Sequence, residues 1–192
     1  MAVTLFSNQT MMLNVQISGL VCSLVECTAT ASSISRDGDK VTLGQVTITG
    51  KAYQTSQYAS TDRYITFRIA ATNNGANPNT GTPSVMKSRS IVFNYSYSAA
   101  LSFDVTTDQL IIPVARNLTT HTIYVQAFVA GTTGANGTII PVSITFPKGP
   151  IVYGSVNGKT KMIKKMYGSV NGQTKEIKKL YGSVNGVTKR IY

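Results

Sequence analysis

Apolar and polar residues alternate with a two-residue period along most of the first 147 positions. In residues 64–71, for example, Thr66 and Arg68 separate the apolar residues Ile65, Phe67 and Ile69. This alternation predicts a strand with one buried and one exposed face. The same pattern occurs in residues 91–97, 123–129 and 140–146, and we expect further strands near residues 12–18, 40–49, 101–106 and 110–115.

Turn-forming residues separate these segments. They occur at residues 36–39, in a long loop over residues 73–83, and between Gly131 and Gly137. Seven to nine short strands with Ser/Thr-rich faces and polar loops predict an all-β body, an antiparallel β-sandwich of Ig-like or jelly-roll type.

Two features refine this prediction. Pro113 and Pro141 each lack the backbone N–H that would donate to a neighbouring strand, so we expect their strands at sheet edges. Residues 18–27 fit either a short helix or a bent strand. We prefer the strand because Thr28-Ala-Thr-Ala-Ser follows this segment.

The last forty residues repeat one pattern three times. Tyr-Gly-Ser-Val-Asn-Gly begins at Tyr153, Tyr167 and Tyr181, 14 residues apart, and each copy continues with x-Thr-Lys. Asn-Gly between two short runs is the strongest local signal of a two-residue hairpin turn, because both central residues of a type I′ turn need positive φ. The predicted repeat turns are Asn157-Gly158, Asn171-Gly172 and Asn185-Gly186.

A two-residue turn fixes the register of each hairpin. In the first copy Val156 pairs with Lys159, and Tyr153 pairs with Met162. Five-residue strands joined alternately by Asn-Gly and by Lys-Lys reproduce the 14-residue period, which predicts one continuous meander. Lysine does not favour positive φ in a tight turn. Looser crossovers, with strands of several chains wound together, are therefore the alternative.

The predicted register also assigns the faces of the tail, because side chains alternate along a strand. One face carries aliphatic residues and the lysines opposite the repeat glycines, and the other carries the repeat tyrosines. An isolated hairpin is only marginally stable in water, so these faces need a partner surface. The predicted assembly residues, taken from both faces, are Val156, Ile163, Met166, Val170, Ile177, Leu180, Tyr153, Tyr167 and Tyr181.

Charge is concentrated in the tail. The formal net charge is +11, and residues 148–192 contribute +9 because ten Lys/Arg residues stand against Glu176 alone. Basic blocks can bind nucleic acid, and tyrosines between lysines could stack on bases. We favour a solvated face that keeps a β-array soluble and discourages edge pairing, because the lysines recur with the strand period.

Candidate chemistry is sparse. His121 is the one histidine and stands at the start of a strand, and no catalytic triad, phosphate loop or metal-binding helix can be assembled. Asp37 and Asp39 could touch a cation, but we interpret them as turn residues. Cys22 and Cys27 lack metal-site spacing, and on a regular strand they would face opposite sides, so we expect buried free thiols. We predict no enzyme, cofactor or metal site.

Residues 1–8 lack the features of a signal peptide, and no run approaches the ~20 apolar residues of a membrane span. The Pro147-Lys148-Gly149-Pro150 segment and the change in composition there predict a boundary. The expected domains are a body over residues 1–147, a hinge over 148–151 and three repeats over 152–192, the third truncated.

The Tyr-Gly-Ser-Val-Asn-Gly copies resemble short tandem repeats at the ends of structural proteins of tailed bacteriophages and prophages. The resemblance covers residues 152–192, about a fifth of the chain. It implies a non-enzymatic virion protein, such as a capsid decoration, fibre or tail component, made in the host cytoplasm. Its implied partners are other virion proteins and sister chains, with a trimer favoured by similarity to fibre shafts.

A carbohydrate- or cell-surface-binding module is the alternative function. In that interpretation the loop at residues 73–83 and the tyrosines Tyr53, Tyr58 and Tyr64 contact a host-surface glycan.

Overall fold

The computed structural model describes residues 1–13, 21–55, 61–72, 83–129, 137–148, 152–156, 159–163, 167–177, 181–184 and 187–190. Most of these residues lie in strands, which confirms the all-β prediction, and one short 3-10 turn, η1 (Tyr97–Ala99), is added. The strands of the body are β1 (Val3–Leu13), β2 (Cys22–Ala31), β3 (Ile34–Asp37), β4 (Lys40–Leu43), β5 (Val46–Gln54), β6 (Thr61–Ala70), β7 (Ser84–Tyr95), β8 (Leu101–Thr106), β9 (Leu110–Pro113), β10 (Thr120–Val129) and β11 (Ile139–Thr145).

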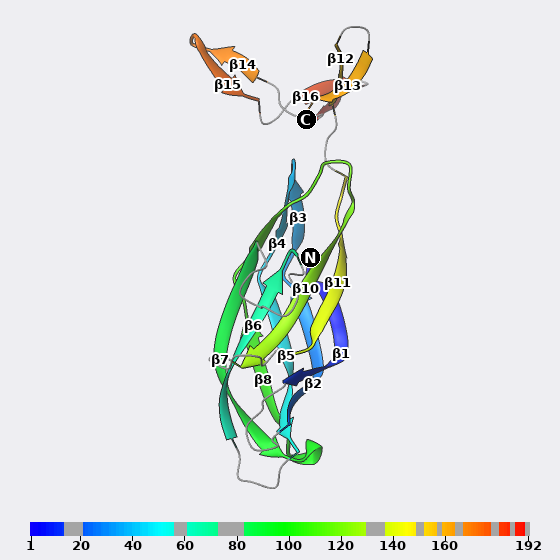
Figure 1. Cartoon of the computed structure of the whole chain (residues 1–192). Helices are drawn as coiled ribbons and strands as arrows, with labels where there is room; N and C mark the ends of the chain where they lie inside the picture. Colours follow the sequence, from blue (N-terminus) through cyan, green and yellow to red (C-terminus); the bar gives the residue numbers. More distant parts are fainter. Residues whose placement is uncertain are drawn as a thin grey trace.

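Eight of these strands form one sheet in the order β1-β2-β5-β7-β6-β10-β11, with β8 also paired to β5. The sheet curls until its first strand meets its last. The Thr138 amide donates to the Met12 carbonyl at 3.1 Å, and the Met12 amide donates to Thr138 Oγ1 at 3.1 Å. The body is therefore an elongated, barrel-like structure around one core (Figure 1).

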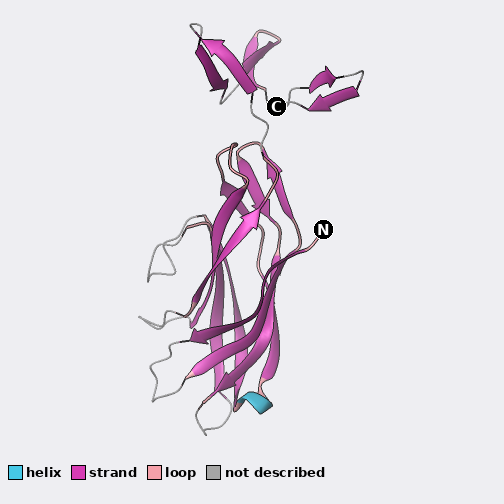
Figure 2. Cartoon of the chain, turned by 90° about the vertical axis from the view of Figure 1, so that its right-hand side faces the viewer, coloured by secondary structure: helices cyan, strands magenta, loops and turns pink. Residues whose placement is uncertain are grey.

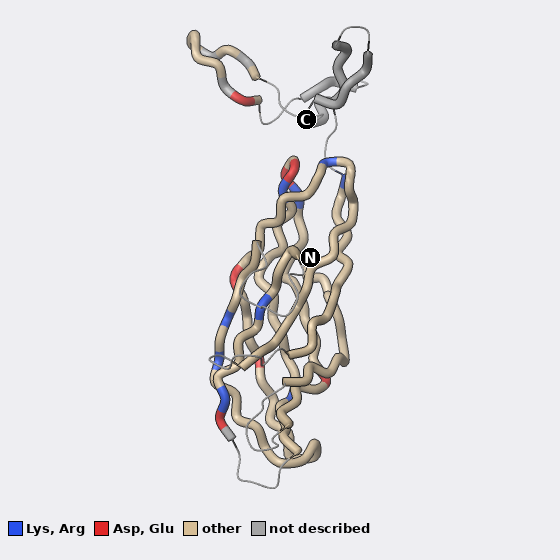
Figure 3. Tube along the Cα trace, viewed as in Figure 1, with Lys and Arg blue, Asp and Glu red and all other residues tan. Residues whose placement is uncertain are grey.

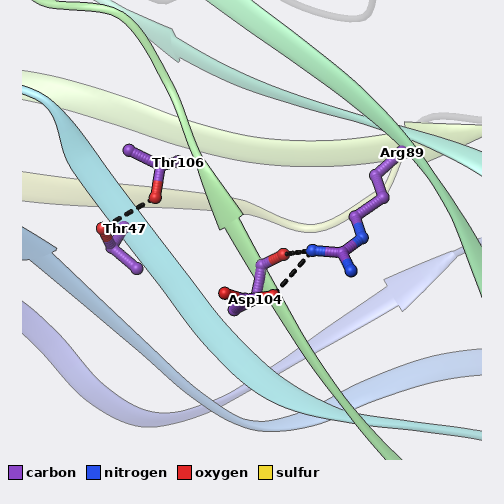
Figure 4. Close-up of polar contacts among 4 residues, drawn as sticks. All are labelled: Thr47, Arg89, Asp104 and Thr106. Atoms are coloured by element: carbon purple, nitrogen blue, oxygen red, sulfur yellow. Dashed lines mark hydrogen bonds and ion pairs between the residues drawn. The ribbon is translucent and has the colours of Figure 1, made fainter.

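A side chain of β7 connects that strand to β8. On its other side β8 pairs with β5, and Thr47 Oγ1 lies 3.0 Å from Thr106 Oγ1. Arg89 of β7 reaches β8, where its Nη1 bonds Asp104 Oδ1 at 2.6 Å and also the Asp104 carbonyl (Figure 4). An exposed ion pair thus takes the place of a ladder at this seam.

A second sheet has the order β3-β4-β9, and Figure 1 shows β3 and β4 in the half of the body nearer the hairpins. The β2 and β5 strands continue into β3 and β4 through a shared corner, where the Ser32 amide donates to the Gln45 carbonyl at 2.8 Å and the Gly44 amide donates to the Ser33 carbonyl at 2.9 Å. A Cβ on Gly44 would lie 2.4 Å from Ser32 Oγ. The single strand expected over residues 40–49 is wrong, because the chain changes sheet at this close crossing.

The core lies between the two flanks of the curled sheet. Phe67 of β6 and Phe103 of β8 meet across it with ring centroids 5.6 Å apart. Ile65, Phe67 and Ile69 are buried, as their alternation predicts. Thr66 and Arg68 are also buried, so residues 65–70 of β6 are enclosed on both faces. The half-exposed strand expected there is therefore wrong beyond Tyr64, which is exposed.

A β-bulge in β2 places both cysteines in the core. The ladder between β2 and β5 shifts between Val25 and Thr28, where two residues of β2 oppose Gly50. The extra residue reverses the alternation, so Cys22 and Cys27 are both buried in one cluster. The expected free thiols are confirmed, whereas their predicted placement on opposite faces is wrong.

The edge predictions and the turn predicted at residues 36–39 are confirmed, whereas residues 73–82 and 131–136 of the other predicted loops lie outside the described residues. Pro141 lies in β11 at one end of the large sheet, and Pro113 lies in β9 at one end of the small one. Gly38 has a φ of 62° in the turn between β3 and β4. Residues 22–31 form a strand, as preferred over a helix. Charged residues are scattered along the body (Figure 3).

Candidate assembly interface

Three two-stranded antiparallel sheets follow the body. They are β12 (Val152–Val156) with β13 (Lys159–Ile163), β14 (Tyr167–Val170) with β15 (Gln173–Glu176), and β16 (Tyr181–Val184) with β17 (Val187–Arg190). Figure 1 shows them beyond the end of the body from which β11 leads onward. Each repeat copy thus contributes one hairpin.

The hairpins share one register. In the first, Val156 pairs with Lys159 and Tyr153 with Met162, the same pairs that a two-residue turn predicts. In the second, Tyr167 pairs with Glu176. In all three, the repeat glycine stands opposite a lysine and the repeat serine opposite a threonine.

The second turn has the backbone of a type I′ hairpin. Pairing of Val170 with Gln173 leaves Asn171 and Gly172 as the connection, with φ values of 51° and 73°. Asparagine and glycine are the residues that tolerate these angles at least cost. The other predicted turn residues, Asn157, Gly158, Asn185 and Gly186, lie outside the described residues.

The hairpins are separate sheets. Among the described residues, β13 does not pair with β14, and β15 does not pair with β16. The predicted meander through all three repeats is therefore wrong for the single chain. In the sequence, Lys164-Lys165 and Lys178-Lys179 separate successive hairpins. Lysine does not favour the positive φ that a tight turn requires.

Strand alternation assigns the faces within each hairpin. Cross-strand partners share a face, so Tyr167, Ser169, Thr174 and Glu176 lie together, and all four are exposed. The exposed fraction of Tyr167 is 58%. A lone pair of strands with one exposed face and two unpaired edges is marginally stable by itself. The chemistry available here is association, through strand edges and exposed faces.

The predicted assembly residues are therefore distributed over three hairpins. Ile163 closes the first ladder opposite Val152, while Ile177 follows β15 and is half-buried. Tyr153 and Tyr181 occupy equivalent register positions in the first and third hairpins. Val156 and Val170 are the last residues before their turns, and Met166 and Leu180 lie outside the described residues.

Arg36 fixes the end of the body next to the tail, and nothing in the local sequence pattern marks it. Its Nη1 donates to the Leu118 carbonyl at 2.6 Å and to the Pro147 carbonyl at 3.4 Å. Its Nη2 donates to the Ala115 carbonyl at 2.8 Å, and its Nε to the Gly38 carbonyl at 2.9 Å. One side chain therefore connects the β3/β4 hairpin, the segment after β9 and the exit of β11.

The charge of Arg36 suits it to bind several backbone carbonyls. Burial lowers the pKa of the Arg36 guanidinium, and the nearby Arg116 cation lowers it further, while Asp39 acts in the opposite direction. Arginine remains protonated at physiological pH despite such shifts. The backbone carbonyls thus bind a permanent cation, through charge-assisted hydrogen bonds.

The residues of the glycan alternative are not brought together. Tyr53 pairs with Asn94 and Tyr64 with Ser90, four residues apart along β7, which is ~13 Å along a strand. Tyr58 and residues 73–82 of the predicted loop lie outside the described residues.

His121 and the acidic turn have structural contacts. The Nε2 atom of His121 lies 2.9 Å from the Ala71 carbonyl, to which it donates in the Nε2–H tautomer. The Asp39 carbonyl accepts the Val114 amide at 2.8 Å, which ties the turn to β9. In the described part of the chain, no three His, Cys, Asp or Glu side chains gather as metal ligands. The same residues include no helix long and apolar enough to cross a membrane.

Comparison with known proteins adds no relative: no family model, curated protein or solved structure matches this chain.

Proposed function

We propose that this chain is a non-enzymatic structural protein of a tailed-phage virion, in which a C-terminal hairpin array joins sister chains. The body, of Ig-like or jelly-roll sandwich type, is then the displayed unit, as a capsid decoration, fibre or tail component. The repeat sequence supports the virion assignment by its resemblance to phage structural proteins.

The separation of the hairpins carries the assembly proposal. Each two-stranded sheet has unpaired edges among the described strands. Pairing or packing with the equivalent hairpins of other chains completes the sheets and removes these edges. We favour three chains about a threefold axis, a closed arrangement in which identical hairpins meet.

Sedimentation of two chains tests the proposal. The full chain is expected to sediment as a trimer, whereas a chain ending at residue 147 is expected to be a monomer whose body still unfolds cooperatively. A full chain that stays monomeric at high concentration, or a truncated chain that still assembles, contradicts the proposal. Loss of cooperative unfolding in the truncated chain instead shows that the tail belongs to the core and that the domain boundary is wrong.

A further inference from the structure

Four side chains from three elements meet on the outer surface of the body. Lys51 Nζ lies 2.9 Å from Glu26 Oε2, and the Tyr97 hydroxyl donates to Glu26 Oε1. The Tyr97 ring also meets the Tyr53 ring edge to face, with centroids 5.8 Å apart and planes at 77°. We call Glu26, Lys51, Tyr53 and Tyr97 the distal cluster. Its members come from β2, β5 and η1.

Two residues with strained backbone angles position the Glu26 carboxylate and the Tyr97 hydroxyl. Glu26 has a φ of 52° inside the bulge of β2. Ser96, directly before Tyr97, has a φ of 70° and a ψ of 149°, a region that non-glycine residues rarely occupy. Bulges and strained residues collect where a side chain must be aimed for function, so their coincidence here points to a site.

The backbone around Tyr97 is well held. The Ser96 amide donates to the Gln54 carbonyl at 3.2 Å, and Asn94 Nδ2 donates to the Ala99 carbonyl at 3.0 Å. The strained turn is thus fixed to β5 and β7 rather than left to relax. A preorganised side chain loses less entropy when it binds a ligand.

The polar groups of the cluster are open to solvent. The side chains of Glu26 and Lys51 are 39% and 42% exposed, and Tyr97 is 51% exposed. The hydrogen bond from Tyr97, followed by that from Lys51, lowers the pKa of Glu26, and Glu26 raises the pKa of Lys51. Both groups are therefore charged at neutral pH, and the pair carries no net charge.

This chemistry selects one ligand class. The Glu26 carboxylate repels an anionic ligand, and the Lys51 ammonium repels a cationic one, so the cluster favours neither kind of ion. A sugar offers hydroxyl groups that both donate and accept, and an apolar C–H face that packs on aromatic rings. We propose that the distal cluster binds an uncharged saccharide, with its hydroxyls on Glu26 and Lys51 and its C–H face against Tyr97 and Tyr53.

The position of the cluster leaves it accessible in an assembled protein. Figures 1 and 2 both place η1 at the end of the body opposite the hairpins. The exposed side chains of Tyr95 and Leu101 border this end. Because the site is remote from the tail, the inference goes beyond the assembly proposal and does not depend on it.

Saturation-transfer NMR of the full chain tests the inference at any oligomeric state. The probes are neutral oligomers of glucose, galactose, mannose and N-acetylglucosamine, with sulfated oligosaccharides as charged comparators. We expect at least one neutral oligomer to receive saturation, and Tyr97→Ala and Glu26→Gln to weaken its binding at least tenfold. Leu118→Ala removes an exposed side chain at the other end of the body, beside Arg36, and should leave binding unchanged.

Two further variants separate binding from folding. Tyr97→Phe keeps the ring and loses the hydroxyl, and Lys51→Met loses the ammonium, so both should weaken binding with unchanged thermal unfolding. The inference is overturned if no neutral oligomer receives saturation, if all four cluster variants bind as the parent does, or if sulfated oligosaccharides bind more tightly than neutral ones.

Discussion

The guanidinium carbon of Arg36 lies 5.3 Å from the centroid of the Phe146 ring. Phe146 is buried and directly follows β11, and its amide donates to the Thr119 carbonyl at 2.9 Å. The arginine plane thus covers the last aromatic residue before the linker while its nitrogens bind surrounding carbonyls. The place where the tail leaves the body is set by this pair.

We predict that Arg36→Lys destabilises the body by about 2 kcal/mol, because hydrogen bonds to a charged group contribute roughly 1.5 to 3 kcal/mol and lysine cannot reproduce the planar fork. Urea unfolding measures the loss, and trypsin cleavage after Lys148 should become faster. Arg89→Lys is the matched control. Its partner Asp104 is exposed, so the change there should stay within about 0.5 kcal/mol. Equal losses in the two variants contradict the assigned role of Arg36.

Local periodicity was sufficient for the strands whose environment is regular. Residues 101–106 form β8 with the predicted bounds, and Pro113 and Pro141 mark edges because a missing amide has the same consequence in any fold. The sequence predicts a first strand near residues 12–18, whereas β1 begins at Val3, because its exposed, irregular half shows no clear alternation.

Features created by distant contacts could not be predicted. The bulge at Glu26 depends on Gly50, which lies 24 positions further along the chain. Arg36 binds carbonyls about 80 and 110 residues away, and backbone carbonyls leave no mark in a sequence pattern. Tyr97 approaches Glu26 only because η1 turns back beside β5. By contrast, the hairpin register followed from Asn-Gly, since a type I′ turn is a property of two adjacent residues.

Gly50 provides the space that the bulge requires. A Cβ at this position would lie 2.9 Å from two ring carbons of Phe103 and 3.0 Å from Cys27 Sγ. We predict that Gly50→Ala destabilises the body by roughly 1 to 3 kcal/mol, the usual cost of overpacking. In urea unfolding, Gly50→Ala combined with Cys27→Ala should lose less than the sum of the two single variants. Additive losses rule out steric conflict with the thiol.

Because its two thiols are buried, we predict that the body becomes less stable to unfolding at alkaline pH. Burial raises the pKa of Cys27 to about 12 and also raises the pKa of Cys22, where Arg63 acts in the opposite direction. Between pH 9 and about 12 the unfolded chain ionises Cys27 while the folded chain does not. The free energy of unfolding should therefore fall by up to about 1.4 kcal/mol per pH unit in this window.

Urea unfolding at pH 8 to 10.5 measures this dependence. Cys27→Ala lowers stability at pH 8 through the lost side chain, but its alkaline slope should be smaller than that of the parent chain. Identical slopes in the two chains contradict the assignment of the effect to Cys27.

The second hairpin turn should depend on its glycine. A Cβ built on Gly172 meets no atom of the described residues within 4 Å, so strain there comes from the φ of 73° alone. We predict that Gly172→Val costs on the order of 1 to 2 kcal/mol and accelerates proteolysis of the tail. Lys175→Ala, in the same ladder, should cost only a few tenths of a kcal/mol. Equal protease resistance of the two variants refutes the turn assignment.

Assembly of sister chains should depend on the aliphatic face of the hairpins. Ile163 and Ile177 occupy corresponding positions in successive repeats. Ile163 is the last residue of β13, opposite Val152, and Ile177 directly follows β15. A carboxylate buried at an interface without a partner is strongly unfavourable, whereas in a free hairpin it stays solvated. We therefore expect the double variant Ile163→Asp with Ile177→Asp to sediment as a monomer, with thermal unfolding of the body unchanged.

Thr160→Asp with Thr174→Asp adds the same charge on the opposite face and is expected to remain assembled. If the isoleucine variant also stays assembled, the aliphatic face is not the contact. If instead both variants dissociate, added charge rather than the identity of the face governs assembly.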